Sequence, residues 1–140
     1  MPITLNHTIV PAHDKEKTAR FYAHIFGFEY IGAFASFIVV RVNETLCLDF
    51  ADRDKFESHH YAFKVSEAEF DVIFDRIQAE KIKYGSGPYD PEDMKINHNY
   101  GDRGVYFRDA NGHLLEMLTA DFIKLKIASS CAKVMKPGFE

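Results

Sequence analysis

The chain has 140 residues, of which 46% are hydrophobic, and this length and composition suit one domain with a core of its own. Lys and Arg number 17 against 21 Asp and Glu, without a basic run, so we expect no nucleic acid among the partners. The apolar runs fall short of the about 20 residues that span a bilayer, no secretion signal opens the chain, and two cysteines make no disulfide framework, so we expect a cytoplasmic protein that contacts no membrane.

The first half of the chain reads as a strand, a helix and a hairpin. "LNHTIV" from Leu5 is a short apolar strand with a His near its start. "TARFYAHIFG" places apolar residues at helical spacing and ends on Gly27, which suits the end of a helix. "FASFIVVRV" and "TLCLDF" then predict a hairpin across Asn43-Glu44.

The second half repeats this order from His59. "HHYAFKV" is a strand that opens with His, and "SEAEFDVIFDRIQAEKI" is an amphipathic helix whose Ser66 and Glu69 form a capping-box signature. A loop rich in Gly, Pro, Asp and Asn covers 85–102. The stretch "GVYFRDANGHLLEML" closes the unit as two strands around a tight Asn111-Gly112 turn.

The chain therefore contains two similar modules, the first about 3–52 and the second about 58–119. Each reads strand, helix, then at least two strands, which predicts an α+β fold in which the modules pair about a pseudo-twofold axis. Residues 120–140 fall outside the repeat. We expect this tail to form a terminal helix that packs on the domain or on a second subunit.

Glu116 lies in the last strand on the same face as two leucines, where an unpartnered carboxylate is costly to bury. The opening strands of the two modules begin with His7 and His60, and pairing of the modules would bring these strands together. Two imidazoles and one carboxylate make a three-point site for a divalent cation, with positions left open for substrate. Matching the two closing strands places Cys47 opposite Glu116.

The stretches "LNHTIV", "HHYAFKV" and "GVYFRDANGHLLEML" resemble the vicinal-oxygen-chelate superfamily, which includes glyoxalase I, bleomycin-resistance proteins, extradiol dioxygenases and fosfomycin-modifying thiol transferases. The resemblance implies one glyoxalase-like domain over 1–140, built of two paired βαβββ modules that form a cup-shaped mixed sheet. It also implies that His7, His60 and Glu116 bind the metal, which could be Fe, Mn, Zn, Ni or Co. We expect a homodimer, and the modules pair either within a chain or between chains.

The resemblance leaves the branch of the superfamily open. The preferred function is a metal-dependent glyoxalase- or dioxygenase-like enzyme that acts on a small oxygenated metabolite through two neighbouring oxygens, with its catalytic residues unknown. Alternatives are a bleomycin-resistance-type protein that only sequesters a ligand, and a fosfomycin-type thiol transferase. "HYAF" at His60 and the loop residue Lys95 favour the last, whereas Cys47 at the fourth, acidic position of glyoxalase I is a departure from that enzyme.

A few further residues are candidates for catalytic or substrate-binding roles. His98, Tyr100 and Tyr106 are loose candidates for acid–base work, and Asp49 is a candidate for a more distant acid. His113 has the opposite parity to Glu116, which predicts a side chain that faces solvent or pairs across strands. The basic residues Arg41, Lys95 and Arg103 are candidates for contacting an anionic substrate, with surface ion pairs or a solvated loop as the plainer reading.

Overall fold

The structure is a computed structural model that describes the backbone of residues 2–135 and the side chains of 2–100 and 102–129, so the end of the predicted tail, 136–140, lies outside the described residues. Its elements follow the expected order. In chain order they are β1 (His7–Ala12), α1 (Lys15–Phe26), β2 (Glu29–Phe34), β3 (Phe37–Arg41), β4 (Cys47–Asp52), β5 (His60–Lys64), α2 (Glu67–Ala79), β6 (Tyr84–Gly85), a 3₁₀ turn (Asn99–Gly101), β7 (Gly104–Arg108), β8 (Leu114–Leu118) and α3 (Phe122–Met135).

The strands form two four-stranded mixed sheets with the same internal order. One sheet runs β1-β4-β3-β2 and the other β5-β8-β7-β6. In each sheet the first strand of the module pairs in parallel with the last, and the remaining pairs are antiparallel. The additional strand of each module is β2 in the first and the two-residue β6 in the second. The predicted α+β fold of two paired βαβββ modules is confirmed.

Both module helices begin and end where the sequence provides caps. The carboxylate of Asp14 accepts the Lys17 N–H at the start of α1, and Gly27 ends it in the left-handed region at φ 79°. At the start of α2, Ser66 and Glu69 each accept the other's backbone N–H, which completes the predicted capping box. These caps satisfy N–H groups that a helix leaves free, so each crossover helix has a defined start.

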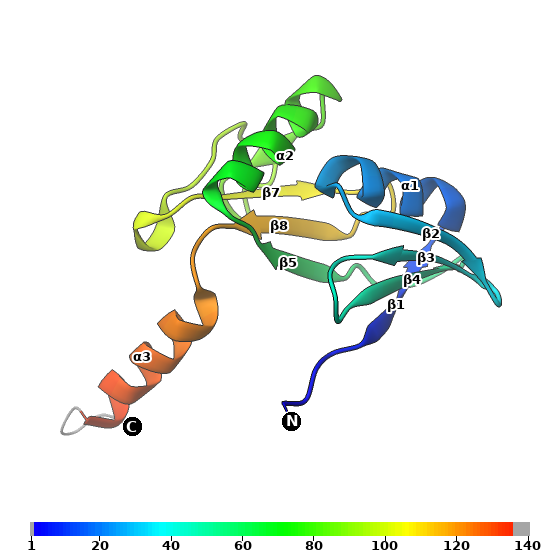
Figure 1. Ribbon diagram of the computed structural model, residues 1–140. Coiled ribbons are helices and arrows are strands. Elements are labelled where there is room, and N and C mark those ends of the chain that lie inside the picture. Colours follow the sequence, from blue (N-terminus) through cyan, green and yellow to red (C-terminus); the bar gives the residue numbers. More distant parts are fainter. Residues whose placement is uncertain (1, 136–140) are drawn as a thin grey trace.

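The helices α1 and α2 lie on the same side of the two sheets, and one hydrophobic core fills the space beneath them (Figure 1). Because side chains alternate along a strand, Tyr61 and Phe63 of β5 pack against this core, while His60, Ala62 and Lys64 face the other way. The largest fully buried core side chains come from both modules: Val10, Tyr22, Ile25, Val40, Leu48, Phe50, Phe70, Ile77, Phe107, Leu115 and Met117.

The joint between the modules is polar and buried. The Tyr22 hydroxyl on α1 donates to Asp109 Oδ2 at 2.7 Å, and burial together with this carboxylate holds the pKa of Tyr22 well above its usual value. Of the two alternatives predicted for His113, the one that faces solvent is wrong, because its side chain is fully buried, and the one that pairs across strands holds. Its Nε2–H donates to the Pro11 carbonyl at 2.7 Å, and its Nδ1 accepts the His59 N–H at 2.9 Å. A neutral His113 therefore ties β1 of one module to the start of β5 of the other.

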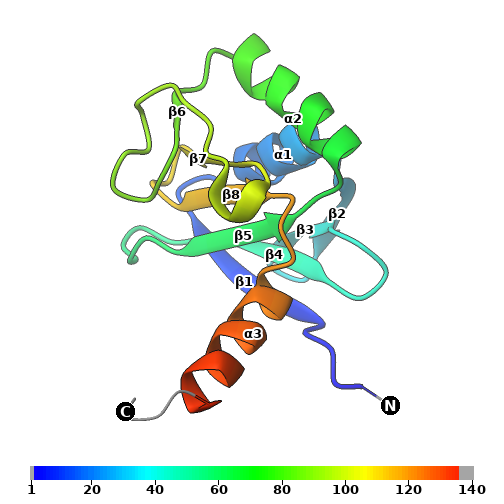
Figure 2. The ribbon, with the colours of Figure 1, turned by 90° about the vertical axis from the view of Figure 1, so that its left-hand side faces the viewer.

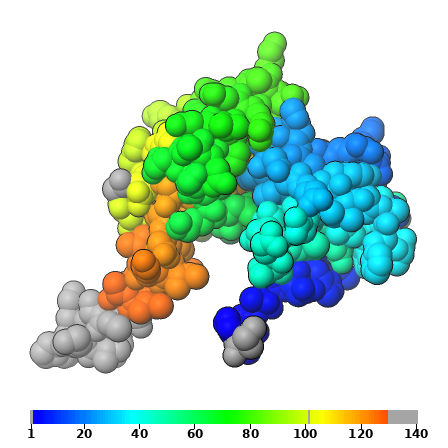
Figure 3. Space-filling view, in the orientation of Figure 1, coloured from blue at the N-terminus to red at the C-terminus, as the bar shows by residue number. Residues whose placement is uncertain are grey.

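The face opposite the module helices is open. In Figures 1 and 2, α3 projects away from the body of the chain, as does the N-terminal segment, and Figure 3 shows the surface between them hollowed. The strands β1 and β5 each lie at an edge of their sheet, with one hydrogen-bonded neighbour apiece. Within residues 2–135, no helix has both the length and the apolar character needed to cross a membrane.

Candidate metal centre and its pocket

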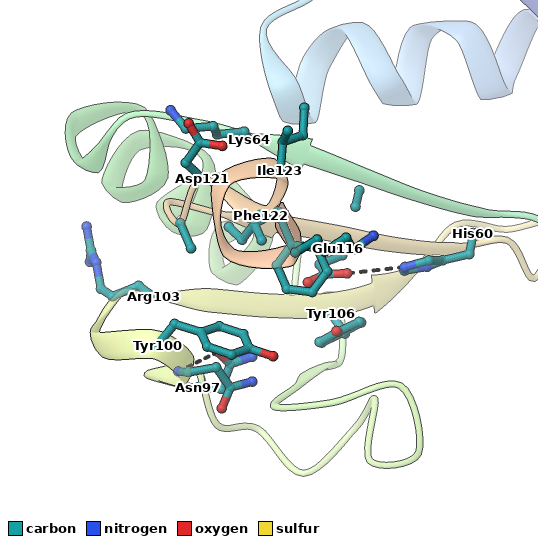
Figure 4. Close-up of a pocket in the computed structure, with 15 residues that line it drawn as sticks. His60, Lys64, Asn97, Tyr100, Arg103, Tyr106, Glu116, Asp121, Phe122 and Ile123 are labelled. Atoms are coloured by element: carbon teal, nitrogen blue, oxygen red, sulfur yellow. Dashed lines mark hydrogen bonds and ion pairs between the residues drawn. The ribbon is translucent and has the colours of Figure 1, made fainter. Parts of the chain in front are cut away.

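His60 and Glu116 meet on the open face of the second sheet. Ala62 on β5 pairs in register with Glu116 on β8, and His60 pairs with Leu114, so His60 and Glu116 lie on one face two positions apart. His60 Nε2 lies 3.2 Å from Glu116 Oε1 (Figure 4). The His60 side chain is half exposed at 48%, whereas that of Glu116 is 14% exposed. Strand parity therefore predicted this pair correctly.

The hydrogen bonds of His60 fix how its two ring nitrogens are used. Its Nδ1 lies 3.1 Å from the Leu114 carbonyl oxygen, which can only accept, so Nδ1 carries a proton. In the neutral ring Nε2 then carries a lone pair, which points at the Glu116 carboxylate oxygen. This arrangement is repulsive unless a positive charge lies between the two atoms. Either a second proton or a cation satisfies both groups. A backbone carbonyl that orients a ligating imidazole in this way is the usual support of a metal-binding His, so the donor set fits a divalent cation.

Tyr106 on β7 completes the inner wall beside this pair. Its ring stacks on His60 with centroids 6.1 Å apart and planes 15° apart, and it pairs in register with Glu116. Burial, with the neighbouring Glu116 charge as the next cause, raises the pKa of Tyr106 to about 12. Tyr106 is therefore a neutral phenol at physiological pH that can donate a hydrogen bond.

His7 does not join His60 and Glu116 within the chain. It begins β1 on the other sheet, is exposed, and places Nδ1 2.8 Å from the side-chain oxygen of Asn6. Among the residues that the structure describes, no three His, Cys, Asp or Glu side chains come together as a cation site. The structure thus assembles two members of the predicted triad and leaves the third on a separate, open edge.

Strand register changes the residue that matches Glu116 in the first module. His7 pairs with Cys47 and Ile9 with Asp49, as His60 pairs with Leu114 and Ala62 with Glu116. The counterpart of Glu116 is therefore Asp49, and the placement of Cys47 opposite it is wrong. Asp49 is 9% exposed and shares its face of the sheet with His7.

A cavity of about 540 Å³ opens from the His60–Glu116 pair. Its walls come from β5, β7, β8, the turn after residue 96 and the first turn of α3, as Figure 4 shows. The inner end is polar, and the outer end is largely apolar and aromatic. The lining residues there are Tyr100, Leu118, Ala120, Phe122 and Ile123, with Asn97, Asn99, Arg103 and Lys126 along the sides.

The comparisons with known proteins agree with this geometry. The model of the glyoxalase/bleomycin resistance protein/dioxygenase superfamily matches residues 4–117, which contain both modules and both residues of the pair. The chain belongs to this superfamily.

Relatives within the superfamily include oxidases and a thiol transferase. The solved structure of oxidase ChaP-H2 is 48% identical, with a TM-score of 0.82, and the match covers 86% of this chain and 95% of that one. Oxidase ChaP-H1 is 41% identical with the same TM-score, covering 86% and 98%. Metallothiol transferase FosB of Lysinibacillus sphaericus (strain C3-41) is 27% identical over 122 residues, which are 83% of this chain and 82% of the relative.

The basic residues that the sequence singled out are mostly engaged elsewhere. Lys95 is exposed and does not line the cavity, and Arg41 forms a surface ion pair with Glu29 at 2.9 Å. Arg103 does line the cavity, but its guanidinium contacts Glu67 and Asp71 on α2, each at 2.8 Å. Two further lysines, Lys64 and Lys126, also line the cavity.

The positions of two aromatic cavity residues, Tyr100 and Phe122, were the hardest to predict from the sequence. Tyr100 adopts φ 60° inside the 3₁₀ turn, a backbone conformation uncommon for a bulky residue. Phe122 begins α3, beyond the superfamily match. A cluster of Asn and Gly around Tyr100 was the one sequence signal of an unusual turn, and nothing in the repeat pointed to Phe122. His98 does not line the cavity.

Alkaline titration should report several protected tyrosines of this superfamily member, among them Tyr22, Tyr61 and Tyr106. Burial, and next the Asp109 charge, raises the pKa of Tyr61 to about 12, as burial does for Tyr106, against an ordinary value of 10.0. Both phenols hold their protons more tightly in the folded state, so the stability they contribute is full below pH 10 and is lost as the pH rises towards about 12. We expect tyrosinate absorbance with a late phase in that window, and a free energy of unfolding that falls across it.

Substitutions of single tyrosines show which side chains titrate in this late phase. Tyr106→Phe should remove part of it, and Phe replacement of the exposed Tyr89 is the control that should leave it intact. A single absorbance phase of the folded protein, centred on the ordinary value of 10.0, would contradict the protection of these phenols.

Proposed function

We propose that this chain is a divalent-metal-dependent enzyme that acts on a small compound chelated through two neighbouring oxygens. The observation that carries the proposal is the His60–Glu116 pair, in which His60 Nε2 and Glu116 Oε1 lie 3.2 Å apart, so that a cation bound there would contact both. Two imidazoles and one carboxylate with open positions are the donor set of non-haem Fe(II) sites, and Mn, Zn, Ni or Co also accept it.

The residues of the site have separable roles in this proposal. His60 and Glu116 supply two ligands, and the Leu114 carbonyl keeps the His60 ring in the ligating tautomer. Tyr106 offers a phenol proton next to the chelating end of the substrate. A bound divalent cation would act as a Lewis acid on the substrate oxygens. Asp49, which matches Glu116 by register, is the candidate for a further acidic group on the face that carries His7.

The third ligand, His7, is proposed to come from a second copy of the chain. The edges of β1 and β5 are open, and an unpaired edge strand is a template for pairing with another chain. Ile9, two positions after His7 on the same face, is 46% exposed and adds apolar surface to this open edge. A homodimer that joins β1 of one copy to β5 of the other would cover this face and bring His7 to the pair.

The relatives favour oxidative chemistry over thiol transfer. The two proteins named oxidases are 48% and 41% identical, whereas the thiol transferase is 27% identical. Lys95, the loop residue that favoured a fosfomycin-type transferase, lies outside the cavity, and Arg103 is engaged with α2. A dioxygenase-like or oxidase-like reaction is therefore the first choice, with thiol transfer and metal-free sequestration of a ligand as the alternatives.

Elemental analysis and turnover assays test the proposal. We expect about one divalent metal ion per chain, and oxygen consumption with compounds that carry neighbouring hydroxyl or keto oxygens. Metal together with thiol addition to an epoxide, and no oxygen uptake, would favour the transferase. A protein that binds ligands tightly but takes up none of the five metals would contradict the enzyme assignment.

Mixing two inactive variants tests the exchange between chains. Substitutions His7→Ala and Glu116→Ala should each abolish metal binding alone. If each site uses His7 of one copy and Glu116 of the other, a mixed dimer contains one intact site, so metal binding and activity return when the two variants are refolded together. No recovery, in a mixture shown to form mixed dimers, would place all ligands of a site on one chain.

A further inference from the structure

The C-terminal helix forms part of the cavity although it lies outside the superfamily match. The match ends at residue 117, and α3 begins at Phe122. The chain nevertheless returns to the cavity there, because Asp121, Phe122, Ile123 and Lys126 all line it. In Figure 4 the start of α3 lies across the cavity from the turn that carries Tyr100. This chain thus adds a wall that the two βαβββ modules do not provide.

The two sides of the outer cavity are joined by an aromatic pair. Tyr100 and Phe122 lie with ring centroids 5.7 Å apart and planes 61° apart, an edge-to-face arrangement. Neither ring is buried, since Tyr100 is 64% and Phe122 38% exposed. An exposed aromatic pair at the mouth of a cavity has apolar faces free to pack on a ligand.

The turn that presents Tyr100 is built to hold it in place. Its φ of 60° is costly for a bulky residue and persists only where neighbours fix the backbone. Asn97 does this: its side chain accepts the Asn99 N–H at 3.2 Å and donates to the Ser86 carbonyl at 3.0 Å. Backbone strain of this kind gathers at binding sites, where the surrounding structure fixes it.

The position of Phe122 is supported from its own helix. The ammonium group of Lys126, one turn later, lies 4.6 Å from the Phe122 ring centroid. Lys124 points to Asp121 instead, at 3.8 Å. The ring of Phe122 therefore has a cation next to it and Tyr100 at its edge, with Leu118 and Ala120 on the cavity wall beside it.

We propose that Tyr100 and Phe122 form an aromatic clamp that binds a ring of the substrate, so that α3 is a specificity element of this enzyme. This inference rests on the proposed function, in which the chelating oxygens of the same substrate lie at the His60–Glu116 end. The cavity of about 540 Å³ accommodates both ends at once. A flat ring that bears neighbouring oxygens fits it, whereas an acyclic chelator would leave the clamp unfilled.

Two probes separate the ends of the cavity. One is a dihydroxynaphthalene with its hydroxyl groups on adjacent carbons, which has both a ring system and a chelating pair. The other is acetohydroxamate, which chelates without a ring. We expect Phe122→Ala and Tyr100→Ala each to weaken binding of the first probe to the zinc-loaded full chain by about tenfold, from lost ring contacts. Binding of acetohydroxamate should be unchanged.

Two further substitutions on α3 are the matched controls. Phe122→Tyr keeps the ring and should restore affinity to within about twofold. Ile127→Ala removes an exposed apolar side chain of the same helix that does not line the cavity, and it should have no effect on either probe. Loss of affinity for both probes in the Ala variants would instead show that α3 acts on the metal site and would overturn the clamp.

A second measurement tests ring binding by the clamp without any metal at the His60–Glu116 pair. Saturation-transfer NMR on the metal-free chain detects contact between the protein and the naphthalene protons even when binding is weak. We expect a signal that Phe122→Ala removes and Ile127→Ala keeps. A chain that binds no zinc but keeps this pattern would refute the proposed function and not the clamp, whereas equal signals from wild type and Phe122→Ala would refute the clamp.

Discussion

Replacing Glu116 with glutamine is expected to abolish stoichiometric metal binding and leave the fold intact. The change removes one negative charge and keeps the shape of the side chain. Amides are poorer ligands than carboxylates for the metals that such a site holds, and loss of even an outer-shell partner costs 10- to 100-fold in affinity, so we expect a loss of at least about 100-fold. Metal titration followed by elemental analysis measures it, and His60→Ala should give the same result.

Asp121→Asn is the matched control for this experiment. It makes the same carboxylate-to-amide change in a residue that lines the same cavity at its other end. We expect it to keep full metal content. The assignment of the metal centre would be wrong if Glu116→Gln kept its metal as well, or if the two variants lost it equally.

Replacing Asp109 with alanine is expected to have the largest effect on stability. The carboxylate is 7% exposed and accepts the Tyr22 hydroxyl at 2.7 Å, the Asn111 N–H at 2.9 Å and the His113 N–H at 3.0 Å. Its removal leaves a buried hydroxyl and the donors of the hairpin turn without an acceptor. Each such group costs 1–3 kcal/mol, so we expect a loss of roughly 3 kcal/mol or more in the free energy of unfolding. Denaturant unfolding measures this loss.

A double-mutant cycle shows how much of this effect belongs to the joint between the modules. In the Asp109→Ala background, Tyr22→Phe removes the unsatisfied hydroxyl and should return part of the lost stability. Asp75→Ala on the exposed face of α2 is the control and should change stability little. Additive effects of the Tyr22 and Asp109 substitutions would contradict the hydrogen bond as the link between modules.

Local patterns in the sequence predicted the elements well because each element carries its own signal. The capping box of Ser66 and Glu69 and the Gly27 helix end are formed by residues that are close together in the chain. The turn between β7 and β8 is centred on Ala110-Asn111, one residue before the predicted Asn111-Gly112. Parity then placed His60 and Glu116 on one face, since a strand alternates its side chains strictly.

The errors came from relations between distant segments. The comparison of the two closing strands suggested Cys47 as the partner of Glu116, but the hydrogen-bonded register gives Asp49. A shift of two residues keeps the face and moves the side chain along the strand, so parity could not detect it. Parity gave His113 the opposite face to Glu116 but could not show that this face is buried there, because His113 contacts the Pro11 carbonyl of the other module.

Arg103 connects the cavity to a surface that no ligand touches. Its guanidinium is held by Glu67 and Asp71 at the start of α2 and covers the Phe70 ring, while its backbone pairs with Thr119, just before the chain leaves β8 for α3. Exchange of either acid on the outside of α2 would free this anchor and let the wall built by α3 settle differently. Substitutions at these solvent-facing positions of α2 can therefore change the substrate specificity of the cavity without any change in the residues that line it.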